Sequence, residues 1–468
     1  MSKIQVILLT LIVYKITLIV IGLWAQRRTR NNTDFFLGGR RLGPVVAAIS
    51  ASASSSSAWT LLGVSGAAYT WGLSAIWLFP ATVGGFLVNW LWVAPRLMPV
   101  SRASGALTLP EFLAGQSSLR GVILKITTAI ILFSFLFYIA AQFQAAGDAF
   151  ASTFDMSMQA AVLIGAAIVL LYTLLGGFWA VSVTDTLQGL LMALTAIILP
   201  VSALLAVGGF TDLMNGLGRV GDLASLSPTG KHAGIAAAGF VAGTLGIGLG
   251  YPGQPHVVNR FMALRDETAL RQATVIAIAW AVIVYAGMIL LGLCGRVLIE
   301  GQGSGEQVFF VLSDQLFPPV VAGVMIAAVL SAIMSTADSQ LLTAASSVSH
   351  DLRLVRKDSG LRYTRIVVVV LSVAAVALAL LAPQSIFSRV LFAWHAIGSA
   401  FGPIVFLRLA GFDIAARALV ASMLCGFFLT VFLYWMPDTP GDFAERLMPF
   451  MLALLIAGTG ARRSHSNV

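Results

Sequence analysis

A succession of apolar runs, each long enough to cross a bilayer as a helix, constrains the fold of this chain more than any other feature. The hydrocarbon core of a membrane requires about 20 apolar residues per helix. Hydrophobic residues make up 58% of the 468-residue chain and charged residues only 10%, whereas a soluble protein carries roughly 25% charged residues. The sequence therefore predicts an all-α polytopic membrane protein embedded in a lipid bilayer.

By the length criterion we expect about 13 transmembrane helices. Their positions are 4–24, 43–70, 73–97, 122–147, 157–176, 180–207, 233–252, 270–298, 318–349, 363–383, 387–409, 412–436 and 442–460.

Charged residues in the loops predict the orientation of the chain. Basic residues gather in loops that share one side if the number of spans is odd: Arg27, Arg28, Arg30, Arg40 and Arg41, then Arg260, Arg265 and Arg271, then Arg353, Arg356, Lys357, Arg362 and Arg365, then Arg462 and Arg463. The opposite loops carry acidic residues: Asp148 and Asp155, then Glu300, Glu306 and Asp314, then Asp438, Asp442 and Glu445. Because short cytoplasmic loops are enriched in Lys and Arg, we expect an external N-terminus and a cytoplasmic C-terminus in the cell membrane. The net charge of +9 follows from these loops and does not indicate nucleic-acid binding.

Two of the predicted spans contain sequence that disfavours a continuous helix. The second span carries six serines within residues 50–57, in the stretch SASASSSSAWT. Serine side chains compete for backbone hydrogen bonds. The seventh span ends in GTLGIGLGYPGQPH at 243–256, where Pro252 removes a hydrogen-bond donor.

The two interruptions lie five spans apart, so the segments that contain them run through the membrane in opposite senses. A pair of interrupted spans in two inverted halves is typical of the central site of a transporter. The alternative is that the small residues only allow close packing of helices.

Several motifs resemble the sodium:solute symporter family, and within it the sodium/proline symporters. They are FFLGGRRLG at 35–43, ALTLPEFL at 106–113, GGFWAVSVTDTLQ at 176–188, GYPGQPHVVNRFMA at 250–263 and MSTADSQLL at 334–342. The resemblance implies a five-plus-five inverted repeat of the leucine-transporter type, with one leading and two trailing helices. The chain would then divide into a leading helix and first cytoplasmic loop at 1–42, a first repeat at 43–207, a second repeat at 233–409 and the trailing helices with the tail at 410–468.

The ninth span presents oxygen atoms suited to a sodium ion. Ala332, Ser335, Thr336 and Ser339 follow the spacing of one helical face, and hydroxyls with unwound carbonyls can coordinate Na⁺ without a full charge. The resemblance implies a common sodium site made by the carbonyls of Ala53, Ser56 and Ala332 and the hydroxyls of Ser335 and Thr336. The alternative is that the two hydroxyls bond only to their own helix.

Two carboxylates lie within predicted spans, Asp185 and Asp338. Acidic groups in hydrocarbon are costly and are functional candidates. The resemblance implies a possible second cation site at Asp185, Ser335, Asp338 and Ser339; a structural cap is the alternative for Asp185. Lys15 in the first span is expected to snorkel or to pair with a neighbour, and His256 and His395 are expected to be structural or hydrogen-bonding groups.

The solute is expected beside the two helix breaks, where backbone N–H groups suit a carboxylate. The candidate solute-binding residues are Ser54, Ser55, Ser57, Trp59, Tyr138, Gln142, Tyr251 and Pro252. The chain departs from the proline symporters at two places: they carry an aspartate at the position of Ser55 and a tryptophan at the position of Ile247. Tyr138 matches their pattern.

The sequence thus predicts a sodium-coupled symporter that imports a small organic solute, an amino acid such as proline, with Na⁺ as the coupling ion and no other cofactor. Another small carboxylate or polar solute, and a proton-coupled carrier using Asp185 or Asp338, are the alternatives. We expect no enzymatic activity, because no GxSxG-type elbow surrounds the serine run. A channel or a transporter-shaped sensor is a further class, but no receptor or kinase sequence follows residue 460.

Overall fold

The computed structural model describes residues 2–26, 37–175, 178–220, 226–299, 304–352 and 360–463. Several loop charges used for the predicted orientation, Arg27, Arg28, Arg30, Glu300, Arg353, Arg356 and Lys357, lie outside these residues.

The described chain is a bundle of helices with one two-stranded sheet. In chain order the helices are α1 (Lys3–Gln26), α3 (Pro44–Ala58), α4 (Val64–Trp71), α5 (Leu78–Leu87), α6 (Ala94–Ser104), α7 (Leu109–Ala114), α8 (Arg120–Phe154), α9 (Met158–Leu175), α10 (Phe178–Val207), α11 (Phe210–Val220), α12 (Gly234–Gly246), α13 (Pro255–Ala263), α14 (Glu267–Leu298), α15 (Val308–Leu316), α16 (Pro319–Ser346), α17 (Gly360–Leu381), α18 (Ile386–Leu409), α19 (Ala416–Tyr434) and α20 (Phe443–Thr459). Strands β1 (Phe412–Ile414) and β2 (Ala461–Arg463) pair antiparallel, with Asp413 opposite Arg462.

Each of the expected transmembrane segments overlaps a helix of the structure, so the all-α membrane fold is confirmed. Within the described residues, ten helical runs are long and apolar enough to cross a membrane. One of them, Pro44–Ser104, has 61 residues and contains two of the expected spans, with Gly72 at a φ of 64° between them. Helices α9 and α20 fall short of that length criterion, so the exact number of thirteen stays a prediction.

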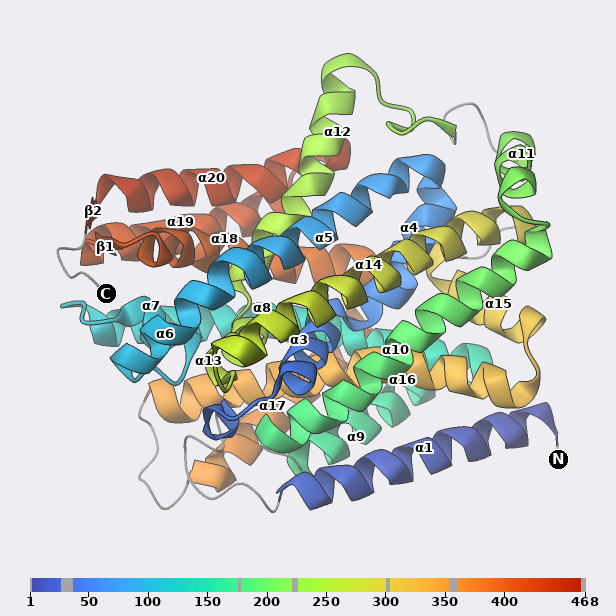
Figure 1. Ribbon diagram of the computed structural model, residues 1–468, viewed down its shortest axis with the longest axis horizontal. Helices are drawn as coiled ribbons and strands as arrows, with labels where there is room; N and C mark the ends of the chain where they lie inside the picture. Colours follow the sequence, from blue (N-terminus) through green and yellow to red (C-terminus); the bar gives the residue numbers. More distant parts are fainter. Residues whose placement is uncertain are drawn as a thin grey trace.

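Helices α18 and α16 are the most buried of the apolar runs. Helix α16 lies inside the bundle, with 23 of its residues buried between other helices. It packs against α3, α8, α10 and α17. In Figure 1, α1 lies along one edge of the bundle, against α16, and α19 and α20 lie along the opposite edge. The first helix and the last two therefore flank a core formed by the helices between them.

Both expected interruptions are present. In α3 the residue Ser57 has a φ of 53° and a ψ of −174°, which breaks the helix before the π-helical turn Trp59–Gly63. The second break follows α12: the 3₁₀ segment Ile247–Gly253 leads to an extended Gln254 and then to α13.

One expectation about the loops is wrong. Arg260 was expected in a basic loop between the seventh and eighth spans, but it lies in α13, all of whose residues are buried. The side chain of Arg260 is only 2% exposed and lies inside the bundle. The reason is that a partner for its charge, Asp185, lies inside as well, which a count of loop charges cannot reveal.

Candidate functional site

The hydroxyls of the ninth predicted span meet carbonyls of the second span that lie shortly before its break at Ser57. Ser335 Oγ donates to the carbonyl of Ala53 at 3.3 Å and to that of Ala332 at 3.3 Å. Thr336 Oγ1 donates to the carbonyl of Ser54 at 3.1 Å and lies 3.5 Å from that of Ala53. All of these residues are buried. The structure therefore brings four of the five residues proposed for the common sodium site into one group of oxygens between α3 and α16.

Ser56, the fifth residue proposed for the sodium site, has other hydrogen-bond partners than the four residues above. Its carbonyl accepts a hydrogen bond from Thr60 Oγ1, and its hydroxyl lies 3.5 Å from the hydroxyl of Tyr285. Its carbonyl is therefore engaged by a residue that follows the break.

A buried ion pair lies next to these oxygens. Arg260 Nη2 on α13 is 3.0 Å from Asp185 Oδ2 on α10 and donates to Ser339 Oγ on α16 at 2.6 Å. The same carboxylate oxygen accepts from Ser50 Oγ at 2.8 Å and from Ser54 Oγ at 3.1 Å. Charged groups in the interior require such pairing and hydrogen bonding, because removing them from water is costly.

The group therefore joins two of the residues proposed for a second cation, Asp185 and Ser339, to an arginine that the sequence analysis had placed in a loop. Asp338 belongs to the same region, since its Oδ1 lies 3.5 Å from Ser339 Oγ. Ser54, expected to face the solute, directs its hydroxyl toward Asp185 and Ser339.

Tyr285 on α14 connects the two helix breaks. Its hydroxyl accepts from Thr60 Oγ1 at 3.2 Å and lies 3.1 Å from the hydroxyl of Tyr251. Thr60 belongs to the first break and Tyr251 to the second. Sequence reasoning missed Tyr285, although a tyrosine in the middle of an apolar helix is a signal that could have found it.

Aromatic side chains cover the same region. The Tyr251 ring lies 4.7 Å from that of Trp394 and 5.3 Å from that of Phe86, measured between centroids. Trp59 packs against Phe387 at 5.5 Å and is 6.5 Å from Tyr285. Trp394 is a second residue that the sequence analysis did not single out.

Three more of the expected solute-binding residues gather at the first break. Gln142 Oε1 accepts the backbone N–H of Ala58 at 3.1 Å. Ser57 Oγ accepts the N–H of Trp59 at 3.1 Å and the hydroxyl of Tyr138 at 3.4 Å. These contacts satisfy backbone groups that the break leaves free.

Ser55, Pro252 and His256 are also buried. The Ser55 hydroxyl donates to the carbonyl of Ser52 at 3.0 Å, and Pro252 lies within the 3₁₀ segment. The His256 ring faces Phe135 and Tyr138, with centroids 5.3 Å and 6.3 Å away. Lys15 Nζ contacts Met334 Sδ, one helical turn before Asp338.

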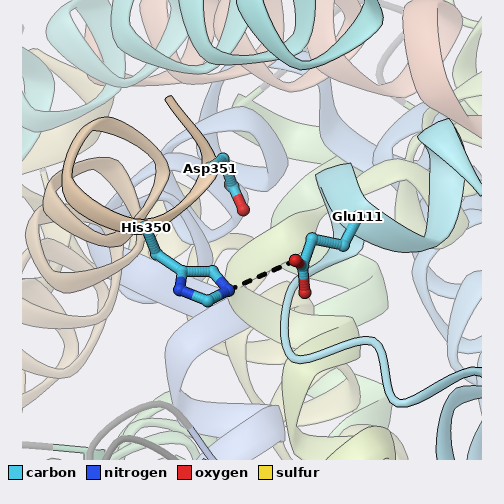
Figure 2. Close-up of side chains that lie close together, drawn as sticks. All are labelled: Glu111, His350 and Asp351. Carbon is cyan, nitrogen blue, oxygen red and sulfur yellow. Dashed lines mark ion pairs between the residues drawn. The ribbon is translucent and has the colours of Figure 1, made fainter. Parts of the chain in front are cut away.

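A second cluster of titratable groups lies at the end of α16. Figure 2 shows Glu111, His350 and Asp351 pointing toward one another, with Glu111 Oε1 3.3 Å from His350 Nε2. Each offers one ligand atom within 4.8 Å of the others, a set that could hold a metal ion.

The contacts of Glu111, however, are those of a helix cap. Its own N–H donates to Thr108 Oγ1, the N-cap of α7, and its Oε2 accepts the N–H of Leu107, the residue before that cap. Burial raises the pKa of Glu111, but hydrogen bonds from His350 and Leu107 and the nearby Arg120 outweigh it, so that the pKa lies below its ordinary value. Thr108 also donates to Asp351 Oδ1 at 2.7 Å, so the cluster fastens α7 to the end of α16.

Comparisons with known proteins agree with this architecture. The family model of the sodium:solute symporter family matches residues 35–426. The sodium/proline symporter of Escherichia coli K12 is 35% identical over 435 residues, covering 90% of this chain and 86% of the relative. The osmoregulated proline transporter OpuE of Bacillus subtilis is 36% identical over 432 residues, covering 90% and 87%.

A solved structure gives the fold independently. A substrate-bound, outward-open Na⁺-coupled sialic acid symporter superimposes with a TM-score of 0.81 at 16% identity, covering 98% of this chain and 99% of the other. At that identity the likeness shows the fold, which is the five-plus-five architecture of the leucine-transporter type.

Proposed function

Because the chain belongs to the sodium:solute symporter family, we propose that it is a Na⁺-coupled symporter that imports a small organic solute, an amino acid of the proline type. The observation that carries the proposal is the meeting of the Ser335 and Thr336 hydroxyls with the carbonyls of Ala53 and Ser54. Relatives that this chain matches over most of its length are named as proline transporters, which supports the choice of solute.

The proposed sodium site uses oxygens supplied by α3 and α16. A sodium ion would be held by the carbonyls of Ala53, Ser56 and Ala332 and by the hydroxyls of Ser335 and Thr336. Neutral oxygens replace part of the hydration shell of the ion without an additional buried charge. Because the ligands come from two helices, binding of the ion would fix the distance between these helices.

The proposed solute site lies between the two breaks. Ser55, Ser57, Tyr138 and Gln142 would line it from the first break and from α8, and Tyr251 and Pro252 from the second. Trp59 would close it on one side, since its ring already packs against Phe387. Tyr285, whose hydroxyl contacts residues of both breaks, is added here as a further lining residue.

The departures from the proline symporters bear on the solute. Ser55 contributes no charge, so a solute cation cannot be paired there. At Ile247 the aromatic side chain is absent, but Trp394 Nε1 donates to the Ile247 carbonyl at 3.1 Å and its ring lies against Tyr251. The proposal therefore includes an aromatic wall supplied by α18, and a different small carboxylate or polar solute is the alternative to proline.

Uptake by the purified protein in proteoliposomes tests the function. Radiolabelled proline should accumulate when an inward Na⁺ gradient is imposed and not when K⁺ replaces Na⁺. Accumulation driven by an inward proton gradient in the absence of Na⁺ would instead indicate a proton-coupled carrier using Asp185 or Asp338. Competition by unlabelled amino acids and small carboxylates would identify the solute class if proline itself does not accumulate.

We also propose that the N-terminus is external and the C-terminus cytoplasmic. A reporter fused after Val468 should read cytoplasmic, and one inserted between α14 and α15, in a segment that the sequence predicted to belong to an external loop at 299–317, should read external. The opposite pair of signals would overturn the orientation derived from the loop charges.

A further inference from the structure

The guanidinium of Arg260 lies among the oxygens where a second cation was expected. Its Nη2 contacts both Asp185 Oδ2 at 3.0 Å and Ser339 Oγ at 2.6 Å, and its Nε donates to Ser50 Oγ at 3.1 Å. Its Nη1 donates to the carbonyl of His256 in the same helix. The guanidinium carbon also lies 5.3 Å from the centre of the Phe178 ring, which covers one of its faces.

Basic side chains of the chain lie near both buried carboxylates of this region. Asp185 and Asp338 are fully buried, and a carboxylate that stays ionised there must have a cation close to it. Arg260 pairs directly with Asp185. Lys15 Nζ lies against Met334, one turn from Asp338, and within electrostatic range of that carboxylate. Asp185 is thus paired with a cation that belongs to the chain, and Asp338 has a basic side chain near it.

We propose that Arg260 is a tethered cation that takes the place of a second coupling ion, so that one Na⁺ is transported with each solute. The inference rests on the proposed function, since it concerns the number of ions that the same site couples. A guanidinium is always charged and presents several donors in a fixed plane, so it satisfies a carboxylate and two hydroxyls at once.

Arg260 is linked to the sodium site through Ser54. The Ser54 carbonyl accepts from Thr336 at 3.1 Å, whereas its hydroxyl donates to the Asp185 oxygen that Arg260 contacts. One residue of α3 therefore belongs to both groups. Because Arg260 sits on α13, directly after the second break, the ion pair also connects that break to α3, α10 and α16.

The wild-type protein provides the first test, which requires no substitution. The ratio of charge to solute, measured from reversal potentials in proteoliposomes, should correspond to one Na⁺ per neutral solute. The Na⁺ activation curve should have a Hill coefficient of about one. Two Na⁺ per solute, with a coefficient clearly above one, would overturn the inference and place a second ion beside Asp185 and Ser339. Uptake that ignores Na⁺ altogether would instead overturn the proposed function.

Substitution of Arg260 provides the second test. Arg260→Ala empties the space but leaves Asp185 and Asp338, so uptake at low Na⁺ should fall at least about tenfold. High Na⁺ should restore uptake with a Hill coefficient above one and two ions per solute, because a second Na⁺ can then enter. Arg260→Lys, which keeps a cation, should retain the wild-type stoichiometry. An Arg260→Ala protein that folds and keeps the wild-type Na⁺ curve contradicts the proposal.

A matched control separates this effect from a general loss of positive charge. Arg265 follows α13 and its side chain is 56% exposed, so Arg265→Ala removes a nearby cation without entering the site. The Na⁺ activation curve of the Arg265→Ala variant should be the same as that of the wild-type protein. If Arg260→Ala is not recovered as a monodisperse protein, the wild-type stoichiometry and the Arg260→Lys variant still decide the question.

Discussion

The two helix breaks occupy corresponding places in the chain but are built differently. The first, in α3, is a single residue, Ser57, at a φ of 53° in a helix with no glycine from Pro44 to Ala58. The second is a seven-residue 3₁₀ segment with Gly248, Gly250 and Gly253, followed by an extended Gln254. The first break thus occurs in a run of serines, whereas the second occurs at glycines, which have no side chain.

The neighbours of each break explain the difference. At the first, side chains satisfy the freed backbone: Gln142 accepts the N–H of Ala58 and Ser57 that of Trp59. At the second, backbone packs on backbone, because a Cβ on Gly398 would lie 2.6 Å from the Gly250 Cα. Oxygen atoms therefore lie close together at the first break, as cation binding requires. At the second break the backbone packs closely against α18, and aromatic rings surround it.

The largest expected effect tests the close packing of the second break against α18. Gly398→Ala places a methyl group against the backbone of Gly250, which cannot move aside as a side chain can. We expect uptake to fall at least about tenfold, with less protein recovered, since overpacking costs about 1–3 kcal/mol or more. Uptake normalised to the amount of protein in the membrane measures it. In Gly84→Ala the new Cβ meets open space, so this variant should behave as wild type.

If the Gly398→Ala variant transported the solute normally, transport would not depend on the close contact between the second break and α18. The contrast between a packed and a hydrogen-bonded break would then be wrong.

The next effect tests the oxygens at the first break. Thr336→Ala removes a hydroxyl that lies 3.1 Å from the Ser54 carbonyl. We expect the apparent Na⁺ affinity to fall about tenfold, on the order of 1.4 kcal/mol, while solute affinity at saturating Na⁺ changes far less. Na⁺ activation of uptake measures it.

The matched control for this prediction is Thr343→Ala. The Thr343 hydroxyl donates to the carbonyl of Ser339 in its own helix, at 2.8 Å. If both variants have the same Na⁺ dependence as wild type, the common sodium site has been assigned to the wrong residues.

A smaller effect concerns the contact between the two breaks. Tyr285→Phe removes the hydroxyl that lies 3.2 Å from Thr60 and 3.1 Å from Tyr251. Na⁺ is expected to increase the affinity for the solute. Because the variant loses about 1 kcal/mol of hydrogen bonding, this increase should be several-fold smaller than in the wild type. Solute binding measured with and without Na⁺ checks it. An unchanged gain would mean that the two breaks communicate by another route.

Sequence patterns predicted the parts of this structure that depend on composition and local order. Apolar length predicted the helices, and the serine run and the glycine-rich stretch predicted both breaks. The spacing of Ser335 and Thr336 predicted that they share one helical face. The resemblance to the family implied that they meet carbonyls of the second span, and in the structure both hydroxyls contact carbonyls of α3.

What depends on distant partners was not predictable in this way. Arg260 was expected in a loop because its partner, Asp185, is 75 residues away in the sequence. Tyr285 and Trp394 each contact a break from a helix that carries no local signal of that contact. Ser54 was expected to face the solute, and only the positions of α10 and α16 show that its hydroxyl meets Asp185 and Ser339.

The smallest expected effect concerns the strain of the first break. Ser57 adopts a φ of 53° and a ψ of −174°, a region that glycine occupies readily and other residues do not. Ser57→Gly and Ser57→Ala both remove the oxygen that accepts from Trp59 and Tyr138, so their difference isolates the strain. We expect the alanine variant to be less stable than the glycine variant by on the order of 1 kcal/mol. Thermal unfolding in detergent, with both variants at one Na⁺ concentration, measures this difference. Equal stability would show that the backbone at residue 57 relaxes into a continuous helix once its hydroxyl is gone, and the first break would then be maintained by the serine side chain alone.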